Sequence, residues 1–370
     1  MKQALYVMIG GFLGAGKSTA LGKLAEHLTS QGLRVGLITN DQGTGLVDTV
    51  QLRSKGFNVE EIAGGCFCCR FHSLAAAAEK LRTETRPDVF LAEPVGSCTD
   101  LVATVSYPLR RIYGDAFRIA PLSVVLDSVR ARRVLGLDTI KTFSPKVLYV
   151  YRKQLEEADF IVMNKTDLLD APSREELRGA LEREYRRAAV LEVSARGGEG
   201  LSAWFDRILG EEMPPGKSME VDYDVYAEGE ALLGWLNGTL RLSGSEEVDG
   251  NALLQELAAA LHRRLCEAEA EVGHLKMTLS PDGGPGEVAV INLVRLDRVP
   301  ELAQMVSGPV RGAEIIVNLR AEADPAVLRR LLEEEVGRRP VPEGSKLVIE
   351  HLESFRPGRP IPTHRIEISS

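Results

Sequence analysis

The stretch GFLGAGKS at positions 11–18 decides the fold of this chain. It matches the phosphate-binding pattern Gly-x4-Gly-Lys-Ser and lies between an apolar run at residues 5–9 and a helical pattern at residues 18–30. This is the strand–loop–helix context that the pattern requires. Glycines let backbone N–H groups curl around phosphate oxygens, and the helix N-terminus favours negative charge. The residues predicted to bind nucleotide phosphates are Gly11, Gly14, Ala15, Gly16, Lys17 and Ser18.

Apolar strand patterns alternate with helical patterns through the first half of the chain, which is typical of a parallel sheet covered by helices. Several of these strands end at a polar residue, and in open α/β sheets ligands bind beyond the carboxyl ends of the strands. The sequence therefore predicts an α/β fold, a doubly wound and mostly parallel sheet of the P-loop NTPase class. Its strands are expected at residues 5–9, 35–39, 89–92, 123–126, 160–163 and 190–193.

The base of the nucleotide is predicted from NKTD at positions 164–167, which directly follows the strand expected at residues 160–163. Asp167 can accept hydrogen bonds from guanine N1–H and from the exocyclic amine, which adenine does not offer in that arrangement. Hydrogen bonds to a charged group contribute about 1.5–3 kcal/mol, enough to select GTP. The dipeptide at 194–195 follows the next strand and can offer a backbone N–H to guanine O6. The predicted guanine-binding residues are Asn164, Lys165, Asp167, Ser194 and Ala195.

Residues near the phosphate loop are predicted to serve the phosphates, the Mg²⁺ ion and the hydrolytic water. Lys17 would neutralise the β- and γ-phosphates, and the Ser18 hydroxyl would ligate Mg²⁺. Glu93 follows the third strand, at a position where an acidic residue normally polarises a metal-bound water. Gly96, three residues further on, can donate its N–H to the γ-phosphate.

Two further carboxylates follow the second predicted strand. Asp41 lies on the same rim as Glu93, and Asp48 stands further along that loop, where it could equally be a capping residue. Any of these three carboxylates could orient Mg²⁺ or the attacking water. The predicted catalytic residues are Lys17, Asp41, Glu93 and Gly96, and the predicted Mg²⁺ ligands are Ser18, Asp41 and Glu93.

Three of the five cysteines stand within four residues, as Cys66, Cys68 and Cys69. On a regular strand Cys69 would point away from the other two, but Gly64-Gly65 supplies the backbone freedom to bring the sulfurs together. Thiolates are good Zn²⁺ ligands, and three of them leave one position of a tetrahedral site open, which suits transient binding or transfer. A redox or incidental buried set is the alternative interpretation.

The fourth ligand position is open to His72, Cys98 or a partner protein. An ordinary surface role is favoured for His72. Cys98 lies two residues beyond Gly96 and is favoured as a buried small hydrophobe. Cys266 stands in a helical pattern and is predicted to belong to a core.

Composition excludes several functions. The formal net charge of −8 argues against a nucleic-acid-binding surface, which normally carries a basic excess. No apolar run reaches the roughly 18 residues of a membrane helix, and residues 4–12 run into the phosphate loop without a signal-peptide cleavage site. Five mostly clustered cysteines fit metal or redox use in a reducing cytoplasm.

A length of 370 residues exceeds the size at which one core usually stops growing, so two domains are expected. Residues 211–220 have the proline, glycine and polar character of a linker. The predicted organisation is a GTPase domain at 1–212, a linker at 213–220 and a smaller α+β domain at 221–370 that recognises a client. In this second domain, helices are expected at 253–272 and 325–336, and short strands at 287–294 and 314–318.

Together these motifs resemble the CobW-like P-loop GTPases, relatives of the nickel-insertion GTPases of urease and hydrogenase. The matches follow the family's order: residues 10–19, which add Thr19 to the nucleotide-binding set, then 65–69, 93–96 and 158–167. The Cys-x-Cys-Cys element is what marks this family among P-loop proteins. The resemblance implies a Mg²⁺-dependent GTPase that binds Zn²⁺ or Co²⁺ through the three cysteines and delivers or allocates the metal to a client.

The chain departs from the family pattern in three places. Pro94-Val95 stands where small hydroxyl residues are usual, the segment at residues 106–121 is longer than expected, and the C-terminal half has no histidine-rich stretch. These departures concern the client and the metal, and they leave the GTPase core unchanged.

The predicted activity is slow GTP hydrolysis, because no arginine finger is evident, with stimulation by metal, by a homodimer contact or by the client. GTP would close the loops bearing Asp41, Glu93 and the cysteines, so that metal affinity depends on the nucleotide. The alternatives are a metal store that the nucleotide only stabilises, an accessory GTPase of a corrinoid enzyme, and a small-molecule kinase. Residues 164–167 disfavour the kinase, and direct corrinoid binding is disfavoured because the sequence contains no Asp-x-His-x-x-Gly.

Overall fold

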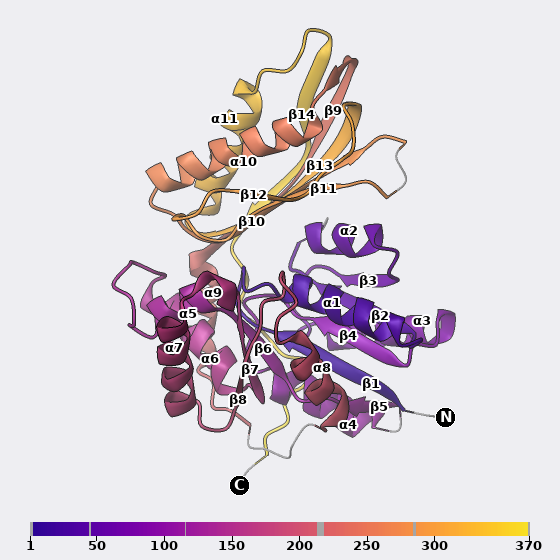
Figure 1. Ribbon diagram of the computed structural model, residues 1–370, viewed down its shortest axis with the longest axis vertical. Helices are drawn as coiled ribbons and strands as arrows, with labels where there is room; N and C mark the ends of the chain where they lie inside the picture. The colour runs from indigo at the N-terminus through magenta and orange to yellow at the C-terminus, as the bar shows by residue number, and fades with distance from the viewer. Residues whose placement is uncertain (1–2, 44–45, 115, 213–217, 284–285, 369–370) are drawn as a thin grey trace. The chain divides into compact units, whose positions relative to one another are not determined.

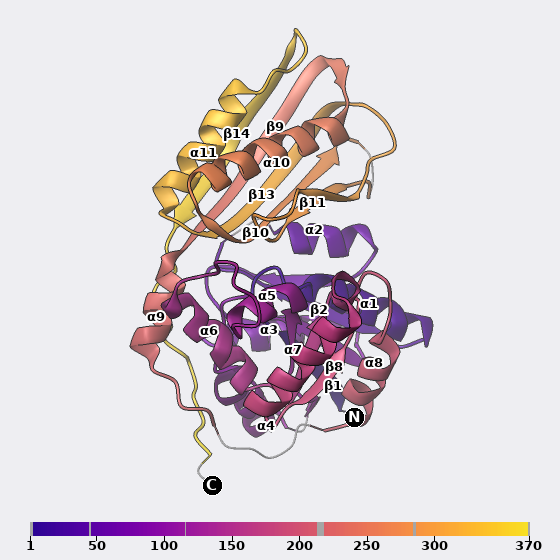
Figure 2. The same cartoon turned by 60° about the vertical axis from the view of Figure 1, so that its left-hand side comes forward.

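Figures 1 and 2 show the computed structural model of the chain from two directions. Among the residues that the structure describes, no helix is long and apolar enough to cross a bilayer. The described residues are 3–43, 46–114, 116–212, 218–283 and 286–368.

Packing divides the chain into two compact units, and each unit is built from separated stretches of sequence. The division therefore differs from the expected contiguous domains at 1–212 and 221–370, and most of the expected linker at 213–220 lies outside the described residues. The first unit comprises Met1–Gln42, Asn58–Gly229 and Arg359–Ser370, and the second comprises Gly43–Phe57 and Glu230–Gly358.

The first unit contains a sheet in which every strand pair is parallel, in the order β3-β2-β4-β1-β6-β7-β8, with β5 also pairing with β1. Its central strands are buried along most of their length, as parallel strands covered by helices usually are. This confirms the predicted doubly wound sheet. The strands are β1 (Ala4–Gly10), β2 (Val35–Asn40), β3 (Val59–Ile62), β4 (Val89–Glu93), β5 (Phe117–Ile119), β6 (Ser123–Asp127), β7 (Phe160–Asn164) and β8 (Ala189–Glu192).

Helices follow most of these strands and pack against the sheet. Several begin at an aspartate whose carboxylate accepts a backbone N–H of the first turn, as Asp127 does from Arg130 and Asp170 does from Ser173. The helical segments of this part of the chain are α1 (Lys17–Ser30), α3 (Phe71–Glu84), η1 (Val102–Ser106), α4 (Tyr107–Tyr113), α5 (Ser128–Val134), α6 (Pro145–Glu156), η2 (Thr166–Leu168), α7 (Ala171–Glu184), α8 (Leu201–Gly210) and α9 (Tyr223–Leu232), whose last residues belong to the second unit.

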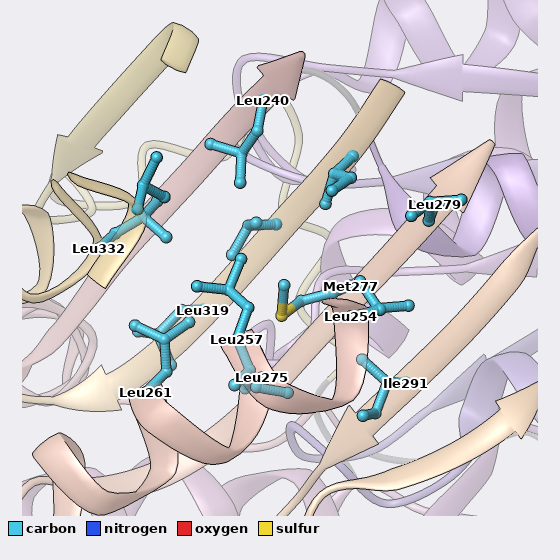
Figure 3. Close-up of a cluster of buried hydrophobic side chains, with 14 of the residues drawn as sticks. Leu240, Leu254, Leu257, Leu261, Leu275, Met277, Leu279, Ile291, Leu319 and Leu332 are labelled. Atoms are coloured by element: carbon cyan, nitrogen blue, oxygen red, sulfur yellow. The ribbon is translucent and has the colours of Figure 1, made fainter. Parts of the chain in front are cut away.

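The second unit contains an antiparallel sheet in the order β12-β11-β10-β13-β9-β14. Two helices, α10 (Gly250–Glu267) and α11 (Pro325–Arg338), cover one face and enclose a core of aliphatic side chains, part of which Figure 3 shows. The strands are β9 (Leu233–Val248), β10 (Glu271–Pro281), β11 (Ala289–Leu293), β12 (Glu301–Gln304), β13 (Val310–Glu322) and β14 (Ser345–Phe355).

A third helix, α2 (Val47–Ser54), lies on the opposite face of this sheet. Side chains alternate along a strand, so Lys276, between two residues of the helix-covered core, points to the other face. There its Nζ lies 2.7 Å from Asp48 Oδ1, and the backbone N–H of Val47 donates to Asn318 Oδ1 at 2.9 Å. The loop that follows β2 is thus part of the second unit, which explains why contiguous domain boundaries do not apply.

The sequence-based elements of the second unit need correction. The helix expected at 253–272 ends at Glu267, and β10 already begins at Glu271. The prediction merged the two because apolar residues continue across the turn between them. Cys266, expected in a core, is exposed on α10. Four strands, β9, β10, β12 and β14, were absent from the predicted set.

Candidate functional site

The phosphate loop (residues 11–18) joins β1 to α1 through backbone angles that favour glycine. Gly11, Gly14 and Gly16 have φ values of +128°, +75° and +96°. Gly16 is the N-cap of α1 and has no side chain with which to cap it. The first backbone N–H groups of a helix have no intrahelical partner, and they form a ready anion site together with the helix dipole.

Three predicted phosphate and magnesium residues lie in direct contact. The Ser18 hydroxyl donates to Glu93 Oε1 at 3.0 Å. Lys17 Nζ lies 3.8 Å from the same oxygen and donates to the carbonyl of Phe12 at 3.4 Å. The side chains of Lys17 and Glu93 are buried, whereas Thr19, on the first turn of α1, is exposed. A cation, a hydroxyl and a carboxylate therefore meet beside the phosphate loop.

The ends of β2 and β4, which are neighbouring parallel strands, contribute the remaining predicted catalytic residues. Asp41 directly follows β2, and its backbone N–H donates to the carbonyl of Ile62 at 3.1 Å. Gly96 lies against the phosphate loop, so closely that a Cβ at this position would be 3.1 Å from the backbone nitrogen of Leu13. Asp48, which had two interpretations, belongs to the second unit, where it forms an ion pair with Lys276.

The predicted base-binding loop is bonded to the phosphate loop. Asn164 Nδ2 donates to the carbonyl of Ala15 at 2.8 Å, and its Oδ1 accepts the backbone N–H of Ala195 at 2.9 Å. Lys165, with φ +62°, donates from Nζ to the carbonyl of Gly14 at 2.7 Å. The side chain of Asn164 thus fixes both predicted base-binding segments to the loop that would bind phosphates.

The last two predicted base residues differ in exposure. Asp167 is exposed in the short 3-10 turn η2, while Ser194 is buried, and its Oγ accepts the backbone N–H of Gly197 at 3.0 Å. An exposed carboxylate next to a buried, well-bonded loop is accessible to a base entering from solvent.

Two residues of this region were not predicted from the sequence. Asp127, at the end of β6, accepts from Lys165 Nζ at 2.7 Å. Arg130 is 1% exposed, lies over the ring of Phe12 and donates from Nη1 to the carbonyl of Leu13 at 2.7 Å. The position of Asp127 after a buried strand was the available signal, whereas nothing in the local pattern distinguishes Arg130 from its neighbours.

The three clustered cysteines occupy the cysteine turn (residues 65–69), which leads into α3. Gly64 and Gly65 have φ values of +75° and +149°, and the backbone N–H of Cys69 donates to the carbonyl of Cys66 at 3.1 Å. The sulfur of Cys66 lies 2.8 Å from that of Cys68 and 3.3 Å from that of Cys69, and the remaining pair is 3.7 Å apart. A turn, rather than a strand, makes the thiols converge.

This sulfur arrangement fits a thiophilic metal. Bonds of about 2.3 Å to a tetrahedral Zn²⁺ place two sulfurs about 3.8 Å apart. The 3.7 Å between Cys68 and Cys69 matches this spacing, and the two distances from Cys66 are shorter. Hydrogen bonding with Cys68 and Cys69 lowers the pKa of the Cys66 thiol. The bond between Cys66 and Cys69 raises the pKa of the Cys69 thiol to about 11. Cys66 and Cys68 are buried and Cys69 is partly exposed, so the site is open on the Cys69 side.

The cysteine turn is bonded to the end of β2. Asn40 Nδ2 donates to the carbonyl of Gly65 at 2.7 Å and to that of Ile62 at 2.9 Å. Asn40 immediately precedes Asp41, the predicted Mg²⁺ ligand. The residue next to Asp41 in the chain is therefore hydrogen-bonded to the cysteine turn.

The C-terminal segment (residues 359–368) runs along the cysteine turn. The backbone N–H of Ile361 donates to the sulfur of Cys69 at 3.3 Å. Thr363 donates through its backbone N–H to the carbonyl of Cys68 at 2.8 Å and through its hydroxyl to the carbonyl of Cys69 at 3.0 Å. Sequence reasoning missed this segment, because contacts between residues so far apart in sequence leave no local pattern.

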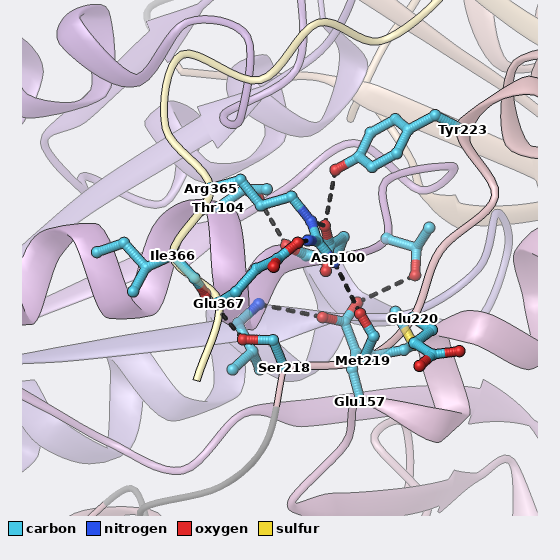
Figure 4. A network of polar contacts seen from close by, with 12 residues as sticks. Asp100, Thr104, Glu157, Ser218, Met219, Glu220, Tyr223, Arg365, Ile366 and Glu367 are labelled. Atoms are coloured by element: carbon cyan, nitrogen blue, oxygen red, sulfur yellow. Dashed lines mark hydrogen bonds and ion pairs between the residues drawn. The ribbon is translucent and has the colours of Figure 1, made fainter. Parts of the chain in front are cut away.

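A polar network anchors the same segment, as Figure 4 shows. Arg365 Nε donates to Asp100 Oδ2 at 2.7 Å, and its Nη2 donates to the carbonyl of Met219 at 2.8 Å. Tyr223 also donates to Asp100 Oδ2, at 2.7 Å. His72, given a surface role from the sequence, is exposed, with its ring centroid 5.7 Å from that of His364.

A parallel sheet, a glycine-rich loop at the N-terminus of α1 and a carboxylate at the adjacent strand end define a P-loop nucleotide-binding protein. Residues 5–192 match the family model described as the CobW/HypB/UreG nucleotide-binding domain. The chain belongs to this family.

Individual relatives are similar over part of their length. The zinc chaperone CobW of Sinorhizobium sp is 30% identical over 217 residues, which cover 53% of this chain and 60% of the relative. The zinc chaperone YeiR of Escherichia coli strain K12 is 28% identical over 174 residues, 46% of this chain and 49% of the relative. The chain thus spans about half to three fifths of the length of these relatives.

Solved structures are similar at lower identity. The hydrogenase maturation factor HypB from Archaeoglobus fulgidus is 21% identical, with a TM-score of 0.40 over 56% of this chain and 89% of that chain. The Zn(II)-bound YjiA GTPase from E. coli is 14% identical, with a TM-score of 0.36 over 92% of this chain and 100% of that chain.

Proposed function

We propose that this chain is a Mg²⁺-dependent GTPase that binds Zn²⁺ or Co²⁺ through Cys66, Cys68 and Cys69 and delivers it to a client protein. Family membership and the zinc-chaperone names of two relatives support the proposal. The observation that carries it is the convergence of three cysteine sulfurs, all within 4.8 Å of one another, on a turn bonded to the strand end that leads to Asp41.

The cysteine turn suits a metal that is carried and handed on. Three sulfurs hold a soft divalent ion, and metal binding displaces protons from the thiols of Cys68 and Cys69, whose pKa is raised. Cys66 and Cys68 are 4% and 1% exposed, while Cys69 is partly exposed. A thiolate or imidazole of the client would therefore replace Cys69 first, and the two buried sulfurs would release the ion last.

The residues beside the phosphate loop fit Mg²⁺ and GTP. Mg²⁺ takes oxygen ligands, and the Ser18 hydroxyl and the Glu93 carboxylate, already in contact, would hold it. The ion would neutralise charge between the β- and γ-phosphates. Lys17 contacts the Glu93 carboxylate and the carbonyl of Phe12. When GTP binds, its ammonium group would contact phosphate oxygens instead. Asp167 would select guanine.

Coupling between nucleotide and metal would pass through Asn40. A γ-phosphate that draws in the Asp41 loop also moves Asn40, whose amide holds the carbonyl of Gly65 at the start of the cysteine turn. Metal affinity then depends on the nucleotide, and by reciprocity nucleotide affinity depends on the metal to the same extent. Hydrolysis of GTP would reset the turn and release the ion.

Chelator competition for Zn²⁺ and Co²⁺ tests the proposal, with Mg²⁺ and either a non-hydrolysable GTP analogue or GDP. Wild type is compared with Cys66→Ser/Cys68→Ser/Cys69→Ser, and Cys266→Ser, an exposed cysteine of the second unit, is the matched control. We expect a tight site that the triple variant loses and the control keeps. Its affinity should differ at least tenfold between nucleotides, about 1.4 kcal/mol of coupling.

Binding that ignores both the nucleotide and the three cysteines would overturn the proposal. GTP hydrolysis is measured on the same samples. Multiple turnovers that disappear in Lys17→Ala support a GTPase, whereas a metal-binding protein without turnover would be a store that the nucleotide stabilises.

A further inference from the structure

A buried arginine of α5 is hydrogen-bonded to the phosphate loop. Arg130 is 1% exposed, and its Nη1 donates to the carbonyl oxygen of Leu13 at 2.7 Å. The guanidinium carbon lies 5.8 Å from the ring centroid of Phe12 and 5.2 Å from that of Phe143. Cations are attracted to aromatic faces at such distances, so two rings and one hydrogen bond together fix the position of this guanidinium.

The bond to Leu13 is one of three that hold consecutive carbonyl groups of the loop. Lys165 Nζ donates to the carbonyl of Gly14 at 2.7 Å, and Asn164 Nδ2 donates to that of Ala15 at 2.8 Å. These two donors belong to the predicted base-binding loop, whereas the donor to Leu13 comes from α5. Side chains from two separate places in the chain thus hold three neighbouring peptide groups by their oxygen atoms.

The direction of the Leu13 carbonyl determines the direction of the next backbone N–H. A peptide group is planar and trans, so its C=O and N–H point to opposite sides, and the described residues have no cis peptide bond. Because Arg130 holds the oxygen of Leu13, the N–H of Gly14 points away from that guanidinium. In a loop of this kind the backbone N–H groups surround the phosphates, so a phosphate on that side would accept this N–H.

We propose that Arg130 is a positioning residue of the nucleotide site, which orients the N–H of Gly14 toward the β-phosphate of a bound guanine nucleotide. This inference rests on the proposed function and adds a residue to its nucleotide site. Arg130 acts through the peptide between Leu13 and Gly14 and does not touch the nucleotide itself. Because the peptide is held before the ligand arrives, less conformational freedom is lost on binding.

Asp127 fixes both sets of donors. Its Oδ1 accepts the backbone N–H of Arg130 at 3.0 Å as the N-cap of α5, and its Oδ2 accepts from Lys165 Nζ at 2.7 Å. Asp127 is only 2% exposed. One buried carboxylate thus sets the start of the helix that carries Arg130 and the position of the lysine that holds the next carbonyl.

Competition against fluorescent GDP, on the full chain with Mg²⁺, measures the affinities for GMP and GDP, which differ by the β-phosphate. The ratio of the GMP to the GDP dissociation constant reports the contribution of this phosphate, and effects on the base or on folding cancel in it. A residue that only stabilises the packing of α5 would leave the ratio unchanged. We expect Arg130→Met to lower the ratio at least tenfold, about 1.4 kcal/mol.

Two further variants accompany this measurement. Arg132→Met is the matched control, because Arg132 stands on the same helix and also donates to carbonyl groups, those of Ser173 and Leu137, which lie outside the phosphate loop. Its ratio should equal that of wild type. Arg130→Lys keeps the buried charge on a shorter side chain without the planar guanidinium, and it should lower the ratio as well.

Amide NMR tests the direction of the N–H. Carbonyl-¹³C leucine and ¹⁵N glycine labels together select the Leu-Gly peptides, of which the sequence contains five. The Gly14 peak is the one that disappears in Leu13→Ile. We expect the Gly14 proton to move downfield when GDP binds to wild type or to Arg132→Met, and to move distinctly less in Arg130→Met. The remaining peaks show whether each variant is folded.

The outcomes separate this inference from the proposed function. If wild type binds GDP no more tightly than GMP, the proposed nucleotide function fails and this inference fails with it. If wild type prefers GDP but Arg130→Met keeps the ratio, the proposed function stands and the role of Arg130 is refuted. A full ratio in Arg130→Lys would show that the positive charge alone is sufficient, which also refutes the positioning role. If Arg130→Met does not fold, Arg130→Lys and the wild-type Gly14 proton decide, and a proton that GDP does not move downfield refutes the inference.

Discussion

Replacing Arg365 by methionine is expected to expose the cysteine turn while the rest of the chain stays folded. The guanidinium of Arg365 bonds to Asp100 and to the carbonyl of Met219, and Asp100 is only 1% exposed. Methionine keeps an unbranched apolar stem at this position but removes the charge and the donors of the guanidinium. Asp100 then loses its cationic partner, and the C-terminal segment loses its strongest anchor.

The size of the effect follows from these contacts. Breaking a buried ion pair costs about 3–5 kcal/mol, and the lower end applies because the Arg365 side chain keeps 24% of its exposure. A terminal segment opens locally, below the free energy of global unfolding. A loss of about 3 kcal/mol from its anchoring raises the open population about 100-fold, since each 1.4 kcal/mol is tenfold.

The assay is the rate at which a water-soluble disulfide reagent modifies the metal-free protein, in a Cys266→Ser background so that the exposed cysteine does not contribute. When reclosing is faster than modification, the rate follows the open population. Arg359→Met is the matched control. Its partner Asp224 and Arg359 itself are 78% and 59% exposed, and surface pairs contribute about 0–1 kcal/mol, so a change below about fivefold is expected. Equal rates in the two variants would refute the anchoring role of Arg365.

Three further outcomes are expected. Gly16→Ala should weaken binding of fluorescent GDP at least about tenfold, because the added Cβ would lie 2.4 Å from Asn164 Nδ2. The control Gly32→Ala, at a φ of +80° and with no described atom within 4 Å of its Cβ, should bind GDP normally. Equal GDP affinities of the two variants would contradict this prediction. Burial raises the pKa of Glu157 well above its usual 4.5, so the Glu157 carboxyl binds its proton more tightly in the folded chain than in the unfolded chain. The protonated carboxyl therefore contributes stability below about pH 4.5, and this contribution is lost as the pH rises through the folded pKa. In Glu157→Gln, the urea-unfolding free energy should therefore fall less between about pH 5 and pH 7.5 than in wild type, and an unchanged slope would count against it. Leu257→Ala, at a fully buried position in the core of the second unit, should lower the unfolding free energy by about 2–5 kcal/mol; a urea titration that shows a loss below about 1 kcal/mol would argue against close packing there.

Local patterns predicted the first unit well. The strands of the parallel sheet that contain long apolar runs, such as Phe160–Asn164, were identified, and so were the phosphate loop and α1. Two strands were missed because their patterns are weak: Val59–Ile62 has two glutamates at its centre, and Phe117–Ile119 has three residues. In the second unit, β9 contains glycine and asparagine within a long run, which hides its alternation.

In the candidate site, too, some contacts could be predicted from local patterns and others could not. The grouping of Lys17, Ser18 and Glu93 and the convergence of the cysteines could be expected, because motif spacing and strand ends carry that information. The bond from Asn40 to the cysteine turn and the ion pair of Asp48 with Lys276 could not. They join residues from separate parts of the chain, and only the folded backbone brings such residues together.

The interleaving of the two units has a consequence for dissecting the protein. The chain passes between them four times, after residues 42, 57, 229 and 358, so no single cut releases either unit whole. A fragment ending at residue 212 would carry α2 without Lys276 and Asn318, and it would lack Thr363 and Arg365 beside the cysteine turn. Metal affinity measured on such a fragment would describe a cysteine turn without the C-terminal segment that lies along it. To produce the first unit alone, the C-terminal segment would have to be rejoined to it by a designed linker.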